Sequence, residues 1–288
     1  MRYVLFNEKS NNGRAKETLE VLKAKLNDPA ATYLNVIGLD VKQLVSKLNA
    51  DDEIILVGGD GTLHHFVNDL DDKIPANNIY FYSAGSGNDF VRDVVEGSEG
   101  KCEDLLLINK YLVNLPWVIL EGKKYYFLNN VGFGIDGYCC EVADKMRAKG
   151  KSEKINYTSI AIKGLLGGYH PTKAEVEVDG QKMEFKHVFL APTMNGRFVG
   201  GGMMLAPHQD RLNEERKVSF VIFKSGFRLN ALMNFPKVFT GEHLKKEKLA
   251  KEFFGKHVKV KFNRPTAIQL DGETFLNQLE YEVFTPEK

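Results

Sequence analysis

The sequence has little of what marks secreted, disulfide-bonded or membrane-spanning proteins. It contains three cysteines, Cys102, Cys139 and Cys140, and this odd number with an adjacent pair indicates neither a disulfide framework nor a C-x-x-C zinc site. No segment approaches the roughly 18 apolar residues of a membrane span. The opening residues, MRYVLFNEKS, form too short an apolar run for a signal peptide. We therefore expect a cytoplasmic protein in a reducing compartment.

The sequence also lacks an excess of positive or negative charge. The 39 lysines and arginines nearly balance the 38 aspartates and glutamates, so the net charge predicts no nucleic-acid partner. An anionic ligand must then be bound locally. The chain has 288 residues, of which 43% are hydrophobic, enough for a buried core and, we expect, for two domains. Nothing in the sequence indicates an oligomeric state.

The first third of the chain alternates between short apolar runs and helical patterns. Strands are expected at 3–6, 33–37, 53–57 and 79–82, and helices from Arg14 and over 41–48 and 63–70. This alternation predicts parallel pairing in a doubly wound sheet, whose ligands bind at the carboxyl ends of the strands.

The pattern changes after about Val95. Residues 96–104, EGSEGKCED, are polar and suggest a linker. The rest is predicted to be mostly strands, interrupted by helical segments at about 138–166 and 229–254. Strands are expected at 117–121, 125–129, 174–178, 188–191, 218–223, 258–262 and 267–270. The second domain is therefore expected to be rich in β-structure.

Three polar, glycine-containing loops follow strands of the first domain. They are Asn7–Gly13, Gly58–Thr62 and Ala84–Asp89. Glycine lets backbone N–H groups approach an anion, and the positive end of the following helix favours negative charge. A single Gly-Gly-Asp-Gly is more often only a turn. Three such loops at one sheet edge favour nucleotide binding, and a bridging Mg²⁺ or hydrogen bonds to loop amides would reconcile Asp60 and Asp89 with a phosphate.

Two further motifs are weak. Gly132-Phe-Gly134-Ile-Asp-Gly137 matches G-x-G-x-x-G, but no βαβ unit continues from it as a dinucleotide site requires. Gly150-Lys-Ser152 resembles the end of a P-loop, but Lys145 stands where the first glycine is needed.

The ordered set of motifs resembles the diacylglycerol kinase catalytic-domain family over nearly the whole chain. GGDGTL at 58–63 is similar to its signature, SAGSGNDFVR at 83–92 to its second glycine-rich motif, NEKSNNG at 7–13 to its first loop, and LDGE at 270–273 to a later landmark. The resemblance implies an α/β nucleotide-binding domain with a three-layer, mostly parallel sheet, and a β-sandwich-like second domain of the NAD kinase and diacylglycerol kinase type. It implies domains at 1–108, with a return segment at 276–288, and at 109–275.

The same resemblance implies transfer of the γ-phosphoryl group of ATP, with Mg²⁺, to a lipid hydroxyl such as that of diacylglycerol. ATP would lie between the two domains. The residues implied in its binding are Asn7, Ser10, Gly13, Gly58, Gly59, Asp60, Gly61, Thr62, Ser86, Gly87, Asn88 and Asp89. Glu273 is implied as the catalytic base, with Asp271 beside it. Asp271-Gly272 also has the composition of a hairpin turn, and both interpretations can hold together.

The sequence departs from the family at the segment PHQDRLNEERKV, residues 207–218, which lacks the Asp-Gly pair that supports a structural metal in many bacterial relatives. Asp210 or Glu215 is the candidate to replace it. Because of this departure, a nucleotide-binding regulatory protein without catalysis stays open. A kinase of a soluble substrate such as NAD stays open as well, supported by GGDGT alone.

Two locally basic stretches, 145–154 and 245–261, suggest peripheral contact with the inner face of a membrane. The alternative is that both are solvated faces diluted by glutamates. The apolar segment 160–166 could line a lipid site or pack in a core.

Overall fold

The computed structural model describes residues 1–8, 15–71, 73–84, 88–102, 104–150 and 155–287. The chain forms two compact units, Met1–Leu115 and Pro116–Lys288. The boundary falls later than the predicted residue 108. The polar segment at 96–104, expected to be a linker, belongs to the first unit, where Asn88 Nδ2 donates to the Gly100 carbonyl over 2.8 Å.

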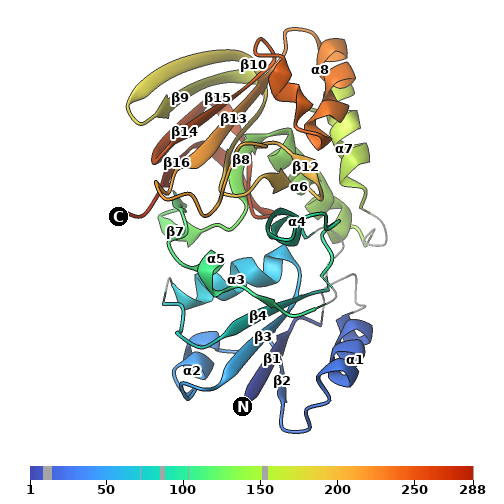
Figure 1. The fold of residues 1–288 in the computed structure, drawn as a ribbon. Helices are drawn as coiled ribbons and strands as arrows, with labels where there is room; N and C mark the ends of the chain where they lie inside the picture. The colour runs from blue at the N-terminus through green and yellow to red at the C-terminus, as the bar shows by residue number, and fades with distance from the viewer. Residues whose placement is uncertain (9–14, 72, 85–87, 103, 151–154, 288) are drawn as a thin grey trace. The chain divides into compact units, whose positions relative to one another are not determined.

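The first unit is an α/β domain. Its elements are β1 (Arg2–Phe6), α1 (Ala15–Leu26), β2 (Thr32–Asn35), α2 (Val41–Val45), β3 (Glu53–Gly58), α3 (Asp60–Leu70), β4 (Ile79–Ser83), α4 (Asp89–Val94), β5 (Leu106–Leu107) and α5 (Asn109–Leu112). The sheet has the order β2-β1-β3-β4-β5, and every pairing is parallel except that of β4 with β5. The predicted alternation of strands and helices is confirmed (Figure 1).

Both faces of this sheet are buried, as a doubly wound fold requires. On one face, Leu19 and Leu22 of α1 pack in one cluster with Val4, Ile55 and Val57. Because side chains alternate along a strand, the intervening Leu5, Ile54, Leu56 and Phe81 point to the other face, and each is fully buried. This explains why the strands read as continuous apolar runs.

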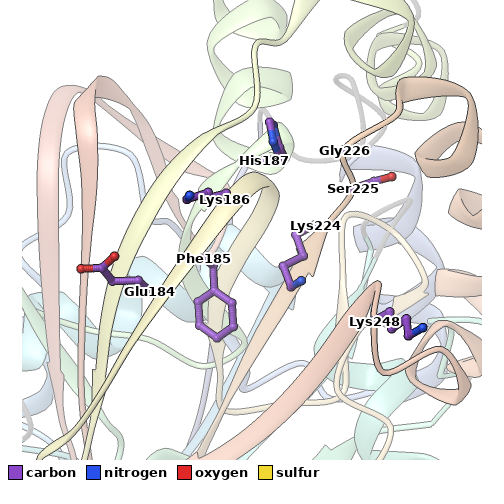
Figure 2. Close-up of a pocket in the computed structure, with 8 residues that line it drawn as sticks. All are labelled: Glu184, Phe185, Lys186, His187, Lys224, Ser225, Gly226 and Lys248. Atoms are coloured by element: carbon purple, nitrogen blue, oxygen red, sulfur yellow. The ribbon is translucent and has the colours of Figure 1, made fainter.

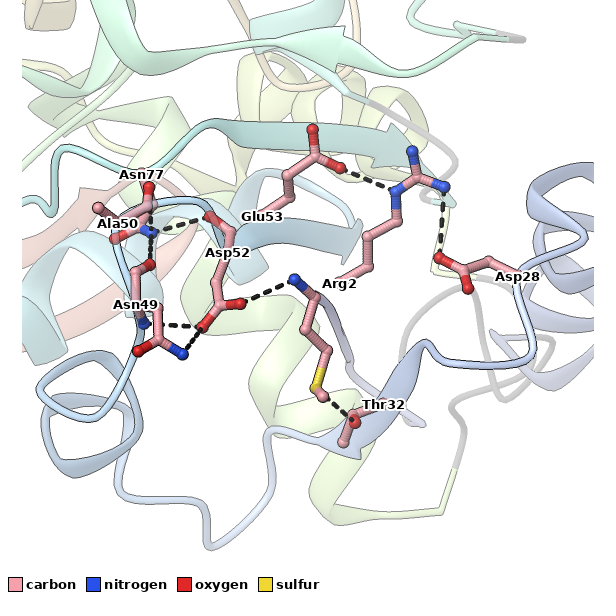
Figure 3. A network of polar contacts seen from close by, with 9 residues as sticks. Arg2, Asp28, Thr32, Asn49, Ala50, Asp52, Glu53 and Asn77 are labelled. Atoms are coloured by element: carbon pink, nitrogen blue, oxygen red, sulfur yellow. Dashed lines mark hydrogen bonds and ion pairs between the residues drawn. The ribbon is translucent and has the colours of Figure 1, made fainter.

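A polar network fastens the amino-terminal edge of the same sheet (Figure 3). Arg2 Nε donates to Glu53 Oε2 over 2.8 Å, linking the starts of β1 and β3. Asn77 Nδ2 donates to the carbonyls of Asn49 (2.7 Å) and Asp52 (2.8 Å), which holds the turns before β3 and β4 together. These bonds lie at the edge opposite the glycine-rich loops and fix the strand register that places those loops.

The second unit is mainly antiparallel. Its strands are β6 (Trp117–Leu120), β7 (Lys123–Tyr126), β8 (Asn130–Gly134), β9 (Thr172–Val178), β10 (Gln181–Met194), β11 (Phe198–Val199), β12 (Met203–Met204), β13 (Val218–Lys224), β14 (Ala250–Gly255), β15 (His257–Leu270) and β16 (Glu273–Phe284). Its helical segments are α6 (Ile135–Ala148), α7 (Tyr157–Lys163), η3 (Gly164–Gly168), α8 (Arg228–Asn234), η4 (Phe235–Phe239) and η5 (Glu242–Lys245).

Two long strands give this unit its layered form. The first half of β10 pairs with β9 and its second half with β8, and β15 pairs with the same two strands. The strands so joined enclose one apolar core, with side chains from β8, β9, β10, β13, β15 and β16. The predicted strands 258–262 and 267–270 are one strand, β15, whose register shifts between Lys261 and Thr266, around Pro265.

Two features of this unit differ from the prediction. Residues 250–255 form β14 rather than the end of a helix, because β13 offers them a full antiparallel partner. Strand β16 was missed. It pairs with β15 and β6 inside the second unit.

Candidate active site

The glycine-rich loops of the first unit lie at one edge of its sheet. Asn7 follows β1, Gly58 and Gly59 join β3 to α3, and Asn88 and Asp89 open α4 after β4. Since β1, β3 and β4 run parallel, their carboxyl ends meet at the same edge. Ser10, Gly13, Ser86 and Gly87 lie outside the described residues.

Asp60 joins the second loop to the third. Its Oδ2 accepts the backbone N–H of Asp89 over 2.8 Å, and its Oδ1 accepts that of Phe90 over 3.0 Å. The first amides of a helix have no partner inside the helix, and Asn88, at the N-cap of α4, makes no side-chain cap hydrogen bond. Asp60 therefore caps α4 from the start of α3. This gives the carboxylate a structural role inside a phosphate-type loop.

The glycines at 58 and 61 meet different requirements. A Cβ on Gly58 would lie 2.0 Å from Thr62 Oγ1, so the packing of the buried Thr62 side chain excludes any larger residue there. A Cβ on Gly61 would meet no atom of the described residues within 4 Å. The loop is thus tightly packed at Gly58 and open at Gly61.

We predict that Asp60→Ala lowers the free energy of unfolding of the first unit by about 2 kcal/mol, because two charge-assisted hydrogen bonds to amides are lost. Asp60→Asn keeps one acceptor oxygen and should lose less. Urea unfolding of the three proteins measures this, with the exposed Asp51→Ala as control. Equal stability of Asp60→Ala and the parent would show that the cap contributes nothing.

In the second unit, Asp271 and Glu273 lie at the hairpin between β15 and β16. Asp271 has φ 47° and Gly272 φ 97°, so the predicted turn is confirmed. The Asp271 carboxylate is buried and accepts the backbone N–H groups of Leu128 (2.7 Å), Asn129 (2.8 Å) and Asn130 (3.0 Å). Glu273, the first residue of β16, is exposed. The two acids therefore differ: one holds a backbone segment and the other faces solvent.

The segment 207–218 contributes an arginine to this region. Arg211 donates from Nη1 to the Leu128 carbonyl and from Nη2 to Asn129 Oδ1, both over 3.2 Å. Asp210 Oδ1 instead accepts the N–H of Leu212 over 2.9 Å. Within the described ranges, no three His, Cys, Asp or Glu side chains gather closely enough to ligate one metal ion. Arg211 was not predicted, because only the acids of this segment resemble metal ligands.

Asp136, inside the weak G-x-G-x-x-G motif at 132–137, is a second residue that was not predicted to matter. The prediction that no βαβ unit continues from this motif is confirmed, because both partners of β8, β10 and β15, are antiparallel to it. Asp136 lies in the first turn of α6, 7% exposed, and Gln269 Nε2 donates to its Oδ2 over 3.4 Å. Gln269 Oε1 also accepts the N–H of Gly272 over 3.0 Å, which links Asp136 to the hairpin. Burial raises the pKa of Asp136 to about 6.

We predict that stability falls as the pH rises from about 4 to 6, owing to Asp136. Its folded pKa lies above the unfolded value of 3.8, so the folded protein retains the proton longer and loses this advantage as Asp136 ionises. The loss amounts to about 3 kcal/mol. Asp136→Asn should remove this component, so its stability relative to the parent should be higher at pH 7.5 than at pH 4. Denaturant unfolding at both pH values tests this, with Asp144→Asn in the same helix as control. A constant difference between parent and Asp136→Asn would contradict the prediction.

Comparison with known proteins identifies the family. Residues 2–111 match the diacylglycerol kinase catalytic domain, and residues 129–281 match the YegS C-terminal NAD kinase beta sandwich-like domain. The chain therefore belongs to the diacylglycerol kinase catalytic-domain family, with a YegS-like second domain. The expected fold class, an α/β domain with a mostly parallel sheet followed by a β-rich domain, is confirmed.

Individual relatives are distant. The protein YtlR of Bacillus subtilis (strain 168) is 27% identical over 165 residues, which are 54% of this chain and only 53% of that relative. A diacylglycerol kinase of the same strain is 27% identical over 232 residues, covering 77% of this chain and 71% of that protein. A crystal structure from Bacillus anthracis str. Sterne has the same fold, with a TM-score of 0.68 and 19% identity over 99% of this chain and 93% of its own.

Proposed function

We propose that this protein is an ATP-dependent lipid kinase that transfers the γ-phosphoryl group of ATP to the hydroxyl of diacylglycerol or a related lipid alcohol. The observation that carries the proposal is the pair of hydrogen bonds from the amides of Asp89 and Phe90 to Asp60. They join the two glycine-rich motifs of the family at one sheet edge. The diacylglycerol kinase of Bacillus subtilis, a relative over most of the chain, supports the choice of acceptor.

The first unit supplies the ATP site in this proposal. The open side of the loop at Gly61 leaves room for a phosphate beside the N-terminus of α3, whose first amides and dipole favour negative charge. Asp60 and Asp89 are the carboxylates of these loops, and Mg²⁺ commonly uses one or two carboxylates together with phosphate oxygens and waters. When bound, Mg²⁺ neutralises part of the charge of the phosphates.

The second unit supplies the base. Glu273 is exposed on the first position of β16 and can accept the proton of a lipid hydroxyl as that oxygen attacks phosphorus. Asp271 is a positioning residue, since its carboxylate is engaged by three backbone amides. The hairpin turn then presents Glu273 while Asp271 anchors the turn to β8.

A radiolabelled ATP transfer assay tests the proposal. Purified protein with Mg²⁺ and γ-labelled ATP is incubated with total cellular lipid extract and with pure diacylglycerol, and both phases are counted after extraction. We expect label in the organic phase that depends on the lipid. Label confined to an aqueous product would point to a soluble acceptor, and ATP binding without transfer to any acceptor would contradict the kinase assignment.

A further inference from the structure

The helical layer of the second unit has an apolar side that nothing in the described chain covers. Its inner side packs in a core cluster that includes Ile160, Leu165, Ala231 and Phe235. Its outer side exposes six large apolar residues, which we call the apolar crest. Their exposed fractions are 38% for Ile162, 62% for Leu166, 79% for Phe227, 66% for Leu229, 62% for Met233 and 36% for Phe239.

The apolar crest is one surface rather than scattered side chains. Ile162 and Leu166 are four residues apart on α7 and η3, and Leu229 and Met233 are four residues apart on α8, so each pair lies on one side of its segment. Segment η3 is in contact with both α7 and α8. Arg228 Nη1 donates to the carbonyls of Leu165 (3.1 Å) and Tyr169 (2.8 Å), which fixes the two segments to each other.

A basic pocket adjoins the crest (Figure 2). It has a volume of about 400 Å³ and is lined by Glu184, Phe185, Lys186, His187, Lys224, Ser225, Gly226 and Lys248. Three of the lining residues are lysines and one is a glutamate, and Lys224 and Lys248 lie on the side of the pocket away from Glu184.

The pocket and the crest are continuous in the chain. Gly226 lines the pocket and Phe227, the most exposed crest residue, follows it directly. Ser225 shapes this turn, because its Oγ donates to the Phe227 carbonyl over 2.9 Å and accepts the Asn230 side-chain amide over 3.2 Å.

The charge around the crest is mainly positive, with Glu184 in the pocket and Glu242 after η4 as the acids nearby. All six crest residues fall in two sequence segments, 155–174 and 216–241, and neither contains an aspartate or a glutamate. The same two segments carry Lys163, Lys173, Lys224, Arg228 and Lys237. Arg216 and Lys217 lie at the other end of β13, where Lys217 pairs with Glu215. An apolar surface with more lysines than glutamates around it complements an anionic lipid membrane, which offers a hydrocarbon interior below a layer of phosphates. This charge pattern favours a membrane over a second copy of the chain, whose crest would carry the same positive charge.

We propose that the apolar crest inserts into an anionic phospholipid membrane while the basic pocket receives the phosphate of a lipid headgroup. The proposed membrane contact lies on α7, η3, α8 and η4 rather than on the basic stretches 145–154 and 245–261 predicted from the sequence. Lys248 is the one lysine that belongs both to these stretches and to the basic pocket. The proposal concerns the second unit alone and does not depend on the proposed kinase activity. Vesicle binding is therefore measured without ATP. A failure of the membrane proposal would leave the proposed kinase activity intact, and a failure of the kinase proposal would leave membrane binding intact.

Sedimentation with vesicles tests the proposal on the full chain. Vesicles of phosphatidylglycerol mixed with phosphatidylcholine are compared with vesicles of phosphatidylcholine alone. We expect binding to the anionic vesicles to be on the order of 10-fold tighter. The double variant Phe227→Glu with Leu229→Glu should lose most of it. The triple variant Lys186→Ala, Lys224→Ala, Lys248→Ala should bind both kinds of vesicle equally weakly.

Matched controls carry the same chemical changes on the first unit. Val21→Glu alters an apolar residue that is 60% exposed on α1, and Lys42→Ala with Lys47→Ala and Lys73→Ala removes three exposed lysines. Both should bind as the parent does. Because the altered crest residues are exposed, the melting temperature should be unchanged, and if the double variant does unfold, Met233→Glu replaces it.

A second measurement locates the inserted residue. The chain has one tryptophan, Trp117, so Phe227→Trp in a Trp117→Phe background reports from the crest alone. Its emission should shift to the blue on anionic vesicles and be quenched by brominated lipid, while Val21→Trp in the same background should not respond. Binding of the parent that is equal for both vesicle types, or unchanged in the double variant, overturns the proposal. So does sedimentation analysis in which the crest holds two copies together and no vesicle is bound.

Discussion

Replacing Glu273 by glutamine is expected to lower kcat for lipid phosphorylation by about 10²- to 10⁴-fold, the usual contribution of a positioned general base. Glutamine has nearly the same shape as glutamate but cannot accept the proton of the attacking hydroxyl. Glu273 is exposed at the start of β16, so the substitution disturbs no buried packing, and the melting temperature should stay that of the parent. The KM for ATP should also stay the same, since the loops assigned to ATP belong to the first unit.

The control is Glu280→Gln, an exposed glutamate further along the same strand that forms an ion pair with Lys259 over 3.7 Å. It changes the same charge on the same element and should leave kcat within about twofold, because surface ion pairs contribute little. Single-turnover kinetics separates chemistry from product release. If Glu273→Gln turns over at the parent rate, Glu273 is not the base, while the proposed kinase activity would stand.

The sequence predicted the first unit better than the second for a physical reason. In the first unit the inner strands β3 and β4 are largely buried and β1 has a buried centre, and helices follow all three, so these elements carry their own apolar or periodic signals. Strand β16 was missed for two reasons. Its extended conformation depends on pairing with β15 and β6, which are contacts that its own sequence does not reveal. Its exposed Leu276 and Leu279 also break the alternation of a half-buried strand. Residues 250–255 were assigned to a helix because their lysines, glutamate and phenylalanines fit a helical face equally well.

At the candidate site, too, local motifs could be predicted from the sequence but contacts with distant residues could not. The sequence identified Asp60 and Asp271 by their motifs, but the role of each depends on amides that are distant in the chain. Asp60 accepts from residues about 30 positions away, and Asp271 from residues more than 140 positions away. No spacing rule predicts such contacts. The burial of Asp136 was not predicted, because an acid in the first turn of a helix is ordinarily favoured by the helix dipole on the surface as well.

Asp271→Ala should be the most destabilising single change at this site. The carboxylate accepts three backbone N–H groups at 2.7 to 3.0 Å in a position only 9% exposed, and alanine leaves all three without their acceptor. Each such loss costs about 1–3 kcal/mol, and relaxation recovers part of it. Alanine is also unfavourable at φ 47°, by about 1 kcal/mol. We expect the free energy of unfolding of the second unit to fall by about 3–5 kcal/mol.

Two further substitutions separate these causes. Asp271→Gly tolerates the left-handed conformation but has no side-chain acceptor, whereas Asp271→Asn tolerates it and keeps one oxygen. Stability should therefore rise in the order alanine, glycine, asparagine, aspartate. Urea unfolding of the full chain, followed through Trp117 on β6 of the same unit, measures it. As a positioning residue, Asp271 should affect activity through the hairpin that carries Glu273, so in Asp271→Asn kcat should fall while the KM for ATP stays constant. A variant as stable as the parent but inactive would show instead that the Asp271 carboxylate takes part in the chemistry itself.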